Sequence, residues 1–343
     1  MPRVLKSVQE ANMMKNRHCS LVSKAADALP FATHLTKFSR RAVYDAKEKL
    51  ATNVHLGQRK LLMSEIQFLT LYFKNNPDGR PVVVYVGAAG GKGVKSHLMF
   101  LSSLFPKVSF ILYDGGDFDP RLNEIPLKFE LHNVFFTDAT CLELKKRFAA
   151  VKRDVLFISD IRLGGDSHTK FEKQVERDNA LQLGWVKILK PKYSMLKFRL
   201  PYSLKHGDVI DYNKGKVMLQ MWPPQTSGET RLLITRADIG KSEKYDFKTY
   251  EQSLFFHNKW SRRYCFDVDR VFDDAKDREA VNSLLYADNN TYCKCYDCMA
   301  EFYTLKGYVD LFGKITLQKL VDRVTIEMKR IPFSKEAPDL FTI

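Results

Sequence analysis

The sequence predicts an α/β protein with a doubly wound, mostly parallel sheet. Three apolar runs, at residues 81–87, 109–114 and 155–160, have the continuous hydrophobic pattern of strands that are covered on both faces. Helix-like stretches at residues 92–105 and 141–151 separate these runs. Such alternation is typical of βαβ units, which assemble into a parallel sheet with helices on its two sides.

The segments before and after these runs extend the pattern. Residues 57–75 predict an amphipathic helix, because their apolar side chains recur at helical spacing, and the turn residues 76–79 end it. Later strands are expected at residues 193–200 and 231–236. From about residue 245 the pattern is mostly helical and ends near Ile331. We therefore expect three parts, which are a basic N-terminal segment (1–52), an α/β core (53–245) and a mainly helical C-terminal extension packed on that core (246–343).

The charge of the chain indicates a polyanionic partner. Of its 343 residues, 55 are Lys or Arg and 40 are Asp or Glu, which leaves a net charge of +15 at pH 7. Such an excess favours a nucleic-acid partner. No apolar run approaches the roughly 20 residues needed to cross a bilayer, so no membrane partner is expected. Six cysteines, three of them between residues 293 and 298, favour a reducing compartment over a disulfide framework.

Three of the predicted strands end in residues suited to a ligand. A glycine-rich loop that begins at Gly87 follows the first strand, Asp114 ends the second, and Asp160 ends the third. Ligands of open α/β sheets bind beyond these strand ends, where a carboxylate can bind a ribose diol. Each residue alone also suits a tight turn or a helix cap. Together they favour a nucleoside-containing cofactor and leave open the choice between S-adenosylmethionine and a dinucleotide.

Seven short motifs carry a resemblance to a known family. They are GQ-x-KLL (57–62), VVYVG with a small-residue loop (83–91), DG-x-x-x-DP (114–120), ISD-x-R (158–162), LK-x-R-x-P (196–201), E-x-RLL (229–233) and YE (250–251). In content and order they resemble the poxvirus-type cap-specific mRNA 2′-O-methyltransferases, which also serve as the regulatory subunit of poly(A) polymerase. The resemblance runs from about Gly57 to Asn258.

This resemblance implies a fold, an activity and partners. The fold would be a Rossmann-like S-adenosylmethionine-dependent methyltransferase with helical N- and C-terminal additions. The activity would transfer a methyl group from S-adenosylmethionine to the ribose 2′-OH of the first transcribed nucleotide of capped mRNA, which converts cap 0 to cap 1. Capped mRNA and a poly(A) polymerase catalytic subunit would be the partners, and the place of action the host cytoplasm or the virion of a large DNA virus.

The resemblance also implies a catalytic tetrad of Lys60, Asp160, Lys197 and Glu229. A ribose 2′-OH must lose its proton to attack a methyl group, and a lysine with its usual pKa near 10.4 is charged at pH 7. Burial and a second ammonium group lower the pKa of a lysine and make it a usable base. Lys197 would be that base, positioned by Asp160, with Lys60 as the neighbouring charge and Glu229 holding the lysines together. Without the resemblance, the residues alone favour two ordinary surface ion pairs.

Residues for the cofactor and the cap follow from the same resemblance. The cofactor site would comprise Gln58, Tyr85, Gly87, Gly91, Asp114 and Gly116, with Thr137 beside the adenine. The family has arginine where Gly116 stands, so only backbone can replace that contact. The methylated guanine of the cap would lie between Tyr202 and an N-terminal aromatic residue, for which Tyr44 is the candidate and Phe38 the reserve, with a cation–π term from its charge. Glu251 would read the guanine edge and Arg199 would hold the transcript backbone.

Departures from the family pattern leave some questions open. A second acid in the cap site is replaced by Leu204, and Asp208 and Asp211 are the alternatives. Cys293, Cys295 and Cys298 could form part of a zinc site, but His257 and Cys265 are distant fourth ligands, so we expect thiols at a helix start and no metal. Two other functions compete with cap methylation. They are ribose methylation of a different RNA and a non-catalytic role as the RNA-binding processivity subunit of a poly(A) polymerase.

Overall fold

The protein is built around a seven-stranded mixed sheet. A computed structural model describes residues 29–45, 56–90, 95–161, 168–224, 226–286 and 292–328. The order of the strands across the sheet is β3-β2-β1-β4-β5-β8-β7. The strands are β1 (Val82–Val86), β2 (Ser109–Tyr113), β3 (Phe129–His132), β4 (Val155–Ser159), β5 (Tyr193–Phe198), β7 (Lys216–Met218) and β8 (Thr230–Thr235).

The strand directions establish the fold class. The first five strands along the chain run parallel to their neighbours, whereas β8 is antiparallel to β5 and β7 is antiparallel to β8. This order, with its antiparallel edge, is typical of the Rossmann-like methyltransferase fold. The predicted doubly wound and mostly parallel sheet is therefore confirmed.

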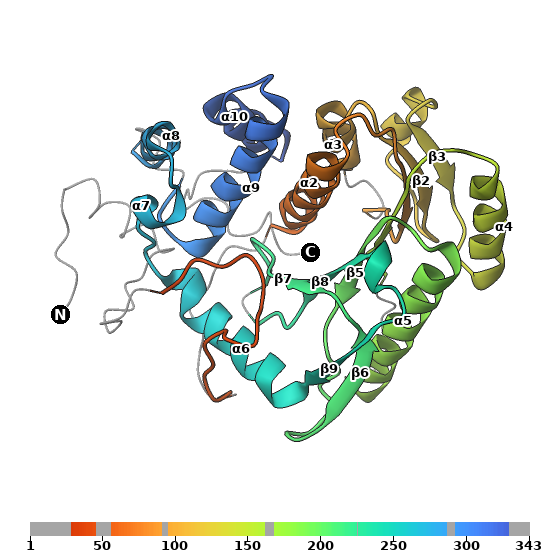
Figure 1. Cartoon of the computed structure of the whole chain (residues 1–343), viewed down its shortest axis with the longest axis horizontal. Coiled ribbons are helices and arrows are strands. Elements are labelled where there is room, and N and C mark those ends of the chain that lie inside the picture. Colours follow the sequence, from red (N-terminus) through yellow and green to blue (C-terminus); the bar gives the residue numbers. More distant parts are fainter. Residues whose placement is uncertain are drawn as a thin grey trace.

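Helices cover both sides of the sheet (Figure 1). On one side α2 (Gly57–Asn75) contacts α3 (Leu98–Leu104), and on the other α4 (Asp138–Ala149) contacts α5 (His168–Leu189). The helix predicted at residues 57–75 has the bounds of α2. Leu62, Ile66 and Leu69 of α2 are fully buried.

The third predicted strand occupies a different place in the structure. The run at residues 155–160, which was predicted as the third strand along the chain, forms β4 and pairs with β1. The third strand along the chain is β3, at the edge of the sheet. Strand β3 was not predicted, because this strand has only four residues and carries polar side chains such as Glu130. A short edge strand does not need the continuous apolar pattern of a central strand.

The register of β1 and β4 brings two predicted ligand residues together. Val86 pairs with Ser159, so the residues that follow these strands, Gly87 and Asp160, are neighbours. Gly87 has a φ of +79°, and a Cβ atom there would lie 2.9 Å from the carbonyl carbon of Asp160. Only glycine therefore allows the two strand ends to approach this closely.

The C-terminal part of the described chain is mostly helical. A two-stranded sheet of β6 (Val209–Asn213) and β9 (Ser242–Asp246) precedes it. The helices are α6 (Phe247–Lys259), α7 (Val268–Val271), α8 (Ala275–Leu285), α9 (Tyr296–Phe312) and α10 (Leu317–Glu327). None of the helices in the described ranges is long and apolar enough to span a bilayer.

Helix α9 joins this helical part to the core through buried ion pairs. Arg59 of α2 donates to Glu301 of α9 with 2.7 Å between Nε and Oε2, and the indole of Trp222 donates to the same oxygen at 2.7 Å. Arg262 pairs with Asp297 of α9 at 2.9 Å. All of these side chains are almost fully buried. Breaking such a pair leaves an uncompensated buried charge, which is strongly destabilising.

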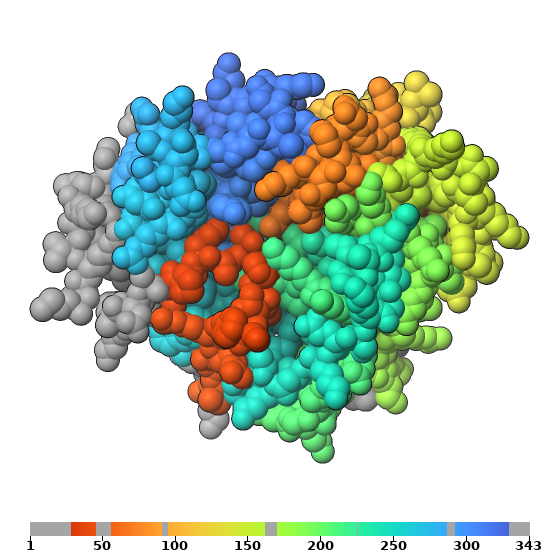
Figure 2. Space-filling model, viewed as in Figure 1, coloured from red at the N-terminus to blue at the C-terminus, as the bar shows by residue number. Residues whose placement is uncertain are grey.

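The described N-terminal segment, residues 29–45, crosses the face of the protein. Its backbone bonds extend the sheet, because Leu35 N–H donates to Val217 at 2.8 Å and Leu219 N–H donates to Thr33 at 2.9 Å. Farther along, Ala42 N–H donates to Gln252 of α6 at 3.1 Å. In Figure 2 this segment (red) lies between the C-terminal helices (blue) and the region of α6 and β9 (cyan to green).

Candidate active site

The four predicted catalytic residues meet at the carboxyl edge of the sheet. Lys60 extends from α2, Asp160 follows β4, Lys197 lies in β5 and Glu229 precedes β8. Lys60 Nζ is 2.9 Å from Glu229 Oε1. Lys197 Nζ lies 3.4 Å from Asp160 Oδ1 and 3.4 Å from Glu229 Oε2. Their side chains are only 12–17% exposed, so these are not the ordinary surface ion pairs of the alternative interpretation.

A fifth charged residue, Arg231, completes this cluster. Its guanidinium group is 2% exposed, and its Nη2 lies 2.6 Å from Asp160 Oδ1 and 3.6 Å from Glu229 Oε1. The amide of Gln220, in the orientation that satisfies both groups, donates to Glu229 at 3.3 Å and accepts from Arg231 Nε at 3.0 Å. No role was predicted for Arg231 from the sequence, although Arg231 is part of the E-x-RLL motif. The two-residue spacing of Glu229 and Arg231, which puts two side chains on the same face of a strand, is the sequence signal that could have identified Arg231.

The charges of the cluster act on one another. With all groups ionised, Lys60, Lys197 and Arg231 outnumber the two carboxylates by one charge. Burial lowers the pKa of Lys60, and the Arg231 and Lys197 charges act in the same direction, while Glu229 and Asp160 oppose them. Burial favours the protonated forms of Asp160 and Glu229, but the surrounding cations outweigh it and lower the pKa of both carboxyl groups. Both carboxylates therefore remain ionised near neutral pH.

Asp114, Gly115 and Gly116 form a second group of residues beyond the ends of the neighbouring strands. Asp114 Oδ2 accepts from Ala89 N–H at 2.9 Å, and its Oδ1 accepts from Gly116 N–H at 2.8 Å. A Cβ atom on Gly115 would lie 2.6 Å from the ring of Phe135, an aromatic residue that is 68% exposed. Gly91 lies outside the described residues. An ionised carboxylate with two further acceptor positions, beside loops without bulky side chains, fits a ribose diol.

The other predicted cofactor residues have structural partners. Gln58 Oε1 lies 2.6 Å from His97 Nδ1, and the other ring nitrogen of His97 lies 2.7 Å from Glu65 Oε2. Tyr85 is 1% exposed and donates to Glu65 at 2.8 Å. Gln58 and Tyr85 therefore belong to one buried polar network between α2 and β1. Thr137 is exposed and caps α4 by accepting from Thr140 N–H at 3.2 Å.

The two tyrosines predicted for the cap lie near each other at the surface. Tyr202 is 43% exposed and Tyr44 is 52% exposed. Burial raises the pKa of Tyr202, and Glu172 and the Tyr44 phenol add to that rise. The Tyr44 ring meets the Phe255 ring of α6 edge-on, with 5.3 Å between centroids. Residues 29–45 and α6 together therefore hold Tyr44 in place.

The remaining cap residues are engaged within the protein. Arg199 is 6% exposed and pairs with Glu172 at 2.7 Å, while its guanidinium group lies 4.3 Å from the centre of the Tyr202 ring. This buried position supports Tyr202 and does not present Arg199 to a transcript at the surface. Glu251 pairs with His206, whose Nε2 is 2.7 Å from Glu251 Oε2. Asp208 accepts from Lys205 N–H at 2.7 Å.

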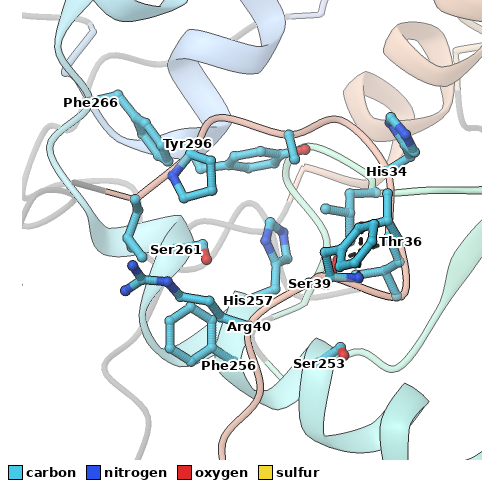
Figure 3. Close-up of a pocket in the computed structure, with 16 residues that line it drawn as sticks. His34, Thr36, Ser39, Arg40, Ser253, Phe256, His257, Ser261, Phe266 and Tyr296 are labelled. Carbon is cyan, nitrogen blue, oxygen red and sulfur yellow. Dashed lines mark hydrogen bonds between the residues drawn. The ribbon is translucent and has the colours of Figure 1, made fainter. Parts of the chain in front are cut away.

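A separate cavity of about 230 Å³ lies beneath residues 29–40 (Figure 3). Phe38, the reserve aromatic for the cap, lines this cavity together with His257 of α6 and Tyr296 of α9. No other predicted site residue lines it. Phe38 therefore lines a cavity to which Tyr202 and Tyr44 do not contribute.

Comparisons with known proteins show the family of this chain. A model of the family described as "Poly A polymerase regulatory subunit" matches residues 30–316. A protein of Fowlpox virus (strain NVSL) named "Cap-specific mRNA (nucleoside-2'-O-)-methyltransferase" is 32% identical over 208 residues, which are 59% of this chain and 66% of the relative. A Myxoma virus (strain Lausanne) protein of the same name is 28% identical over 227 residues, or 65% of each chain.

The match spans just under two thirds of the length of these curated relatives. Because the family match covers most of the chain, this protein belongs to the poly(A) polymerase regulatory subunit family.

Proposed function

We propose that the protein transfers a methyl group from S-adenosylmethionine to the ribose 2′-OH of the first transcribed nucleotide of capped mRNA. The observation that carries this proposal is the cluster of Lys60, Asp160, Lys197, Glu229 and Arg231 next to the strand ends with Gly87 and Asp114. Lys197, the proposed general base, then lies beside a site suited to a nucleoside cofactor. The names of the Fowlpox and Myxoma virus relatives support the same reaction.

The cofactor site and the base divide the work of the reaction. S-adenosylmethionine, when bound, supplies an electrophilic methyl group on a positively charged sulfur. Asp114 accepts hydrogen bonds from the ribose hydroxyls, and Gly87 and Gly116 leave room for the ligand beside it. Phe135 offers an exposed aromatic face next to Gly115 for the adenine.

Lys197 accepts the proton of the 2′-OH as that oxygen attacks. For this it must be present as the neutral amine. Loss of one proton takes the cluster from one excess positive charge to neutrality. Arg231 also contacts Asp160 Oδ1 at 2.6 Å, closer than Lys197 at 3.4 Å, so Lys197 shares this carboxylate with a permanently charged group.

Recognition of the cap rests on Tyr44, Tyr202 and Glu251. A guanine methylated at N7 carries positive charge, which strengthens stacking between two aromatic rings. Glu251 accepts from the N1–H and N2–H groups of the guanine, and His206 holds its carboxylate from the other side. Arg199 and Glu172 keep the Tyr202 ring in position.

The same family supports a second function for the surface of the protein. The family description names a regulatory subunit of poly(A) polymerase, and the net charge of +15 suits retention of an RNA strand. We propose that a poly(A) polymerase catalytic subunit is a partner and that the two functions coexist. The intact cluster of Lys60, Asp160, Lys197 and Glu229 argues against a purely non-catalytic role.

Methyl transfer from labelled S-adenosylmethionine to matched capped and uncapped RNA tests the proposal. The expected product carries its label on the 2′-oxygen of the first transcribed nucleotide, and nuclease digestion followed by chromatography locates it. Equal labelling of capped and uncapped RNA would instead support ribose methylation of another RNA. No transfer at all, with a stimulation of poly(A) polymerase retained, would support the non-catalytic alternative.

A further inference from the structure

Three cysteine thiols gather at the start of α9. The sulfur atoms of Cys293, Cys295 and Cys298 all lie within 4.8 Å of one another. Those of Cys293 and Cys298 are 3.9 Å apart, far more than the ~2.05 Å of a disulfide. All three residues are buried. The chain thus collects three soft ligand atoms at one enclosed point of the fold.

The spacing of these sulfur atoms fits a single metal ion. Four thiolates around a zinc ion, with Zn–S bonds of ~2.3 Å in a tetrahedron, have sulfur atoms about 3.8 Å apart. The observed separation of 3.9 Å matches one edge of such a tetrahedron, and the third sulfur atom lies within 4.8 Å of the other two. Thiolate ligands select zinc over the hard cations magnesium and calcium.

Two backbone features beside the cluster suit sulfur atoms that ligate a metal. The backbone N–H of Cys293 donates to Cys298 Sγ at 3.4 Å, a contact that stabilises a ligating thiolate. Cys295 is the N-cap residue of the 17-residue helix α9, whose N-terminal end carries partial positive charge. Lys294, which is 8% exposed, lies between two of the cysteines in the chain.

The segment that carries Cys265 is bonded to the segment of the three cysteines, although the Cys265 sulfur atom is not among those that lie within 4.8 Å of one another. The backbone N–H of its neighbour Phe266 donates to the carbonyl oxygen of Lys294 at 2.8 Å. Cys265 is 6% exposed. The other sequence candidate, His257, points into the cavity beneath residues 29–40, and its ring packs edge-on against Tyr296 at 4.5 Å (Figure 3). Cys265 is therefore the better fourth ligand.

We propose that Cys265, Cys293, Cys295 and Cys298 bind one structural zinc ion. Each thiol that becomes a ligand releases its proton to solvent as the Zn–S bond forms. A site with four protein ligands is closed and has no open position for a substrate, so its role is structural. It connects the segment before α7 to the start of α9, the helix whose Glu301 holds Arg59 of α2. This proposal replaces the expectation of thiols without metal.

Metal analysis of the full-length protein tests the site. Protein produced in zinc-supplemented medium and passed through gel filtration should contain about one zinc per chain by mass spectrometry. Cys298→Ser should contain less than about a tenth of that amount, because a hydroxyl group is a poor zinc ligand. Wild-type protein without zinc, or with iron in its place, would overturn the proposal.

Cys141→Ala is the matched control. Cys141 is also fully buried, and burial together with Asp138 raises the pKa of its thiol to about 12. Because it stands alone in a different part of the fold, Cys141→Ala should retain the zinc content of the wild type. A loss of zinc in this control equal to that in Cys298→Ser would mean that zinc content reports general destabilisation, and the assignment to the cluster would fall.

Cobalt substitution examines the ligands without relying on a folded Cys298 variant. Wild-type protein with Co²⁺ in place of zinc should show the visible bands of a tetrahedral ion and intense sulfur-to-cobalt absorption. In Cys265→Ser the tetrahedral bands should persist, while the charge-transfer absorption falls by about a quarter as one of four thiolates is lost. An unchanged spectrum would remove Cys265 from the site. The weak spectrum of octahedral cobalt in the wild type would overturn the whole site.

Discussion

Lys197 and Arg231 are direct partners across β5 and β8, and both reach the same oxygen, Oδ1 of Asp160. Residues opposite each other in an antiparallel pair extend to the same face of the sheet. The arginine lies at 2.6 Å and the lysine at 3.4 Å, so the permanently charged group has the closer contact. In the proposed reaction, holding the carboxylates and moving a proton would thereby fall to different side chains.

Replacement of Lys197 should abolish methyl transfer and leave cofactor binding intact. Lys197→Ala removes the base, and Lys197→Arg should fail as well because guanidinium does not deprotonate at a usable pH. Initial rates and calorimetric titration with S-adenosylmethionine provide the two measurements, with the exposed Lys187→Ala as the matched control. Wild-type turnover in either Lys197 variant would refute its role as the base.

Replacement of Arg231 should change the pH dependence of the reaction. In Arg231→Met the excess positive charge of the cluster disappears, and both carboxylates are left to stabilise the lysine charges. The rising limb of the pH–rate profile should therefore move to higher pH. A merely structural arginine would lower the rate by the same factor at every pH, and that result would contradict the proposed electrostatic role.

Asp114→Ala should weaken the binding of S-adenosylmethionine. Loss of hydrogen bonds from a ribose diol to a carboxylate costs about 1–3 kcal/mol. Isothermal titration calorimetry measures the change, and Asp117→Ala, which removes an exposed acid in the same loop, serves as the control. Equal affinities of wild type and Asp114→Ala would exclude contact between this residue and the cofactor.

Two cap-site substitutions should fail in different ways. Tyr202→Ala should erase the preference for N7-methylated over unmethylated cap analogues, because the cation–π term needs the charge of the methylated base. Glu251→Ala should weaken the binding of both analogues, because both display N1–H and N2–H donors. Fluorescence titrations of each variant with the two analogues separate these outcomes.

The choice of the second cap aromatic is tested in the same titrations. Tyr44→Ala should resemble Tyr202→Ala, whereas Phe38→Ala should bind like the wild type because Phe38 lines the separate cavity. The reverse pattern would transfer the stacking role to Phe38. A wild-type protein without preference for the methylated analogue would argue against the cap site altogether.

His257 should make the protein sensitive to acid. Burial, with a smaller contribution from Arg262, lowers the pKa of this histidine to about 3. As the pH falls below about 6.5, the unfolded chain takes up a proton that the folded chain does not, so the free energy of unfolding decreases. Between pH 6.5 and pH 5 the loss from this group is about 2 kcal/mol.

Urea unfolding of wild type and His257→Phe at several pH values measures this effect. Other titrating groups are shared by both proteins and cancel in the difference between them. That difference should change by about 1.4 kcal/mol for each pH unit below 6.5. A difference that stays constant with pH would mean that His257 takes up its proton equally in the folded and the unfolded chain, and that its pKa is not lowered by folding.

The sequence by itself determined the order of the main elements and the residue types at the ligand edge of the sheet. Continuous apolar runs are required for strands covered on both faces, so β1, β2 and β4 were recognisable without any knowledge of their neighbours. The bounds of α2 followed from the helical spacing of its apolar residues and from the turn after it. Lys60, Asp160, Lys197 and Glu229 were found because short motifs carry them.

Only the tertiary structure decided how these residues are partnered. The strand pairing that sets Arg231 opposite Lys197, the burial of Arg199 against Glu172 and the hydrogen bond between His206 and Glu251 all join segments far apart in the chain. The approach of Cys265 to the cysteines before α9 is of the same kind. Periodicity and local turn chemistry report the environment of a residue within its own element, whereas charge coupling and metal-ligand geometry depend on distances between elements. Those distances are set by the packing of the whole core.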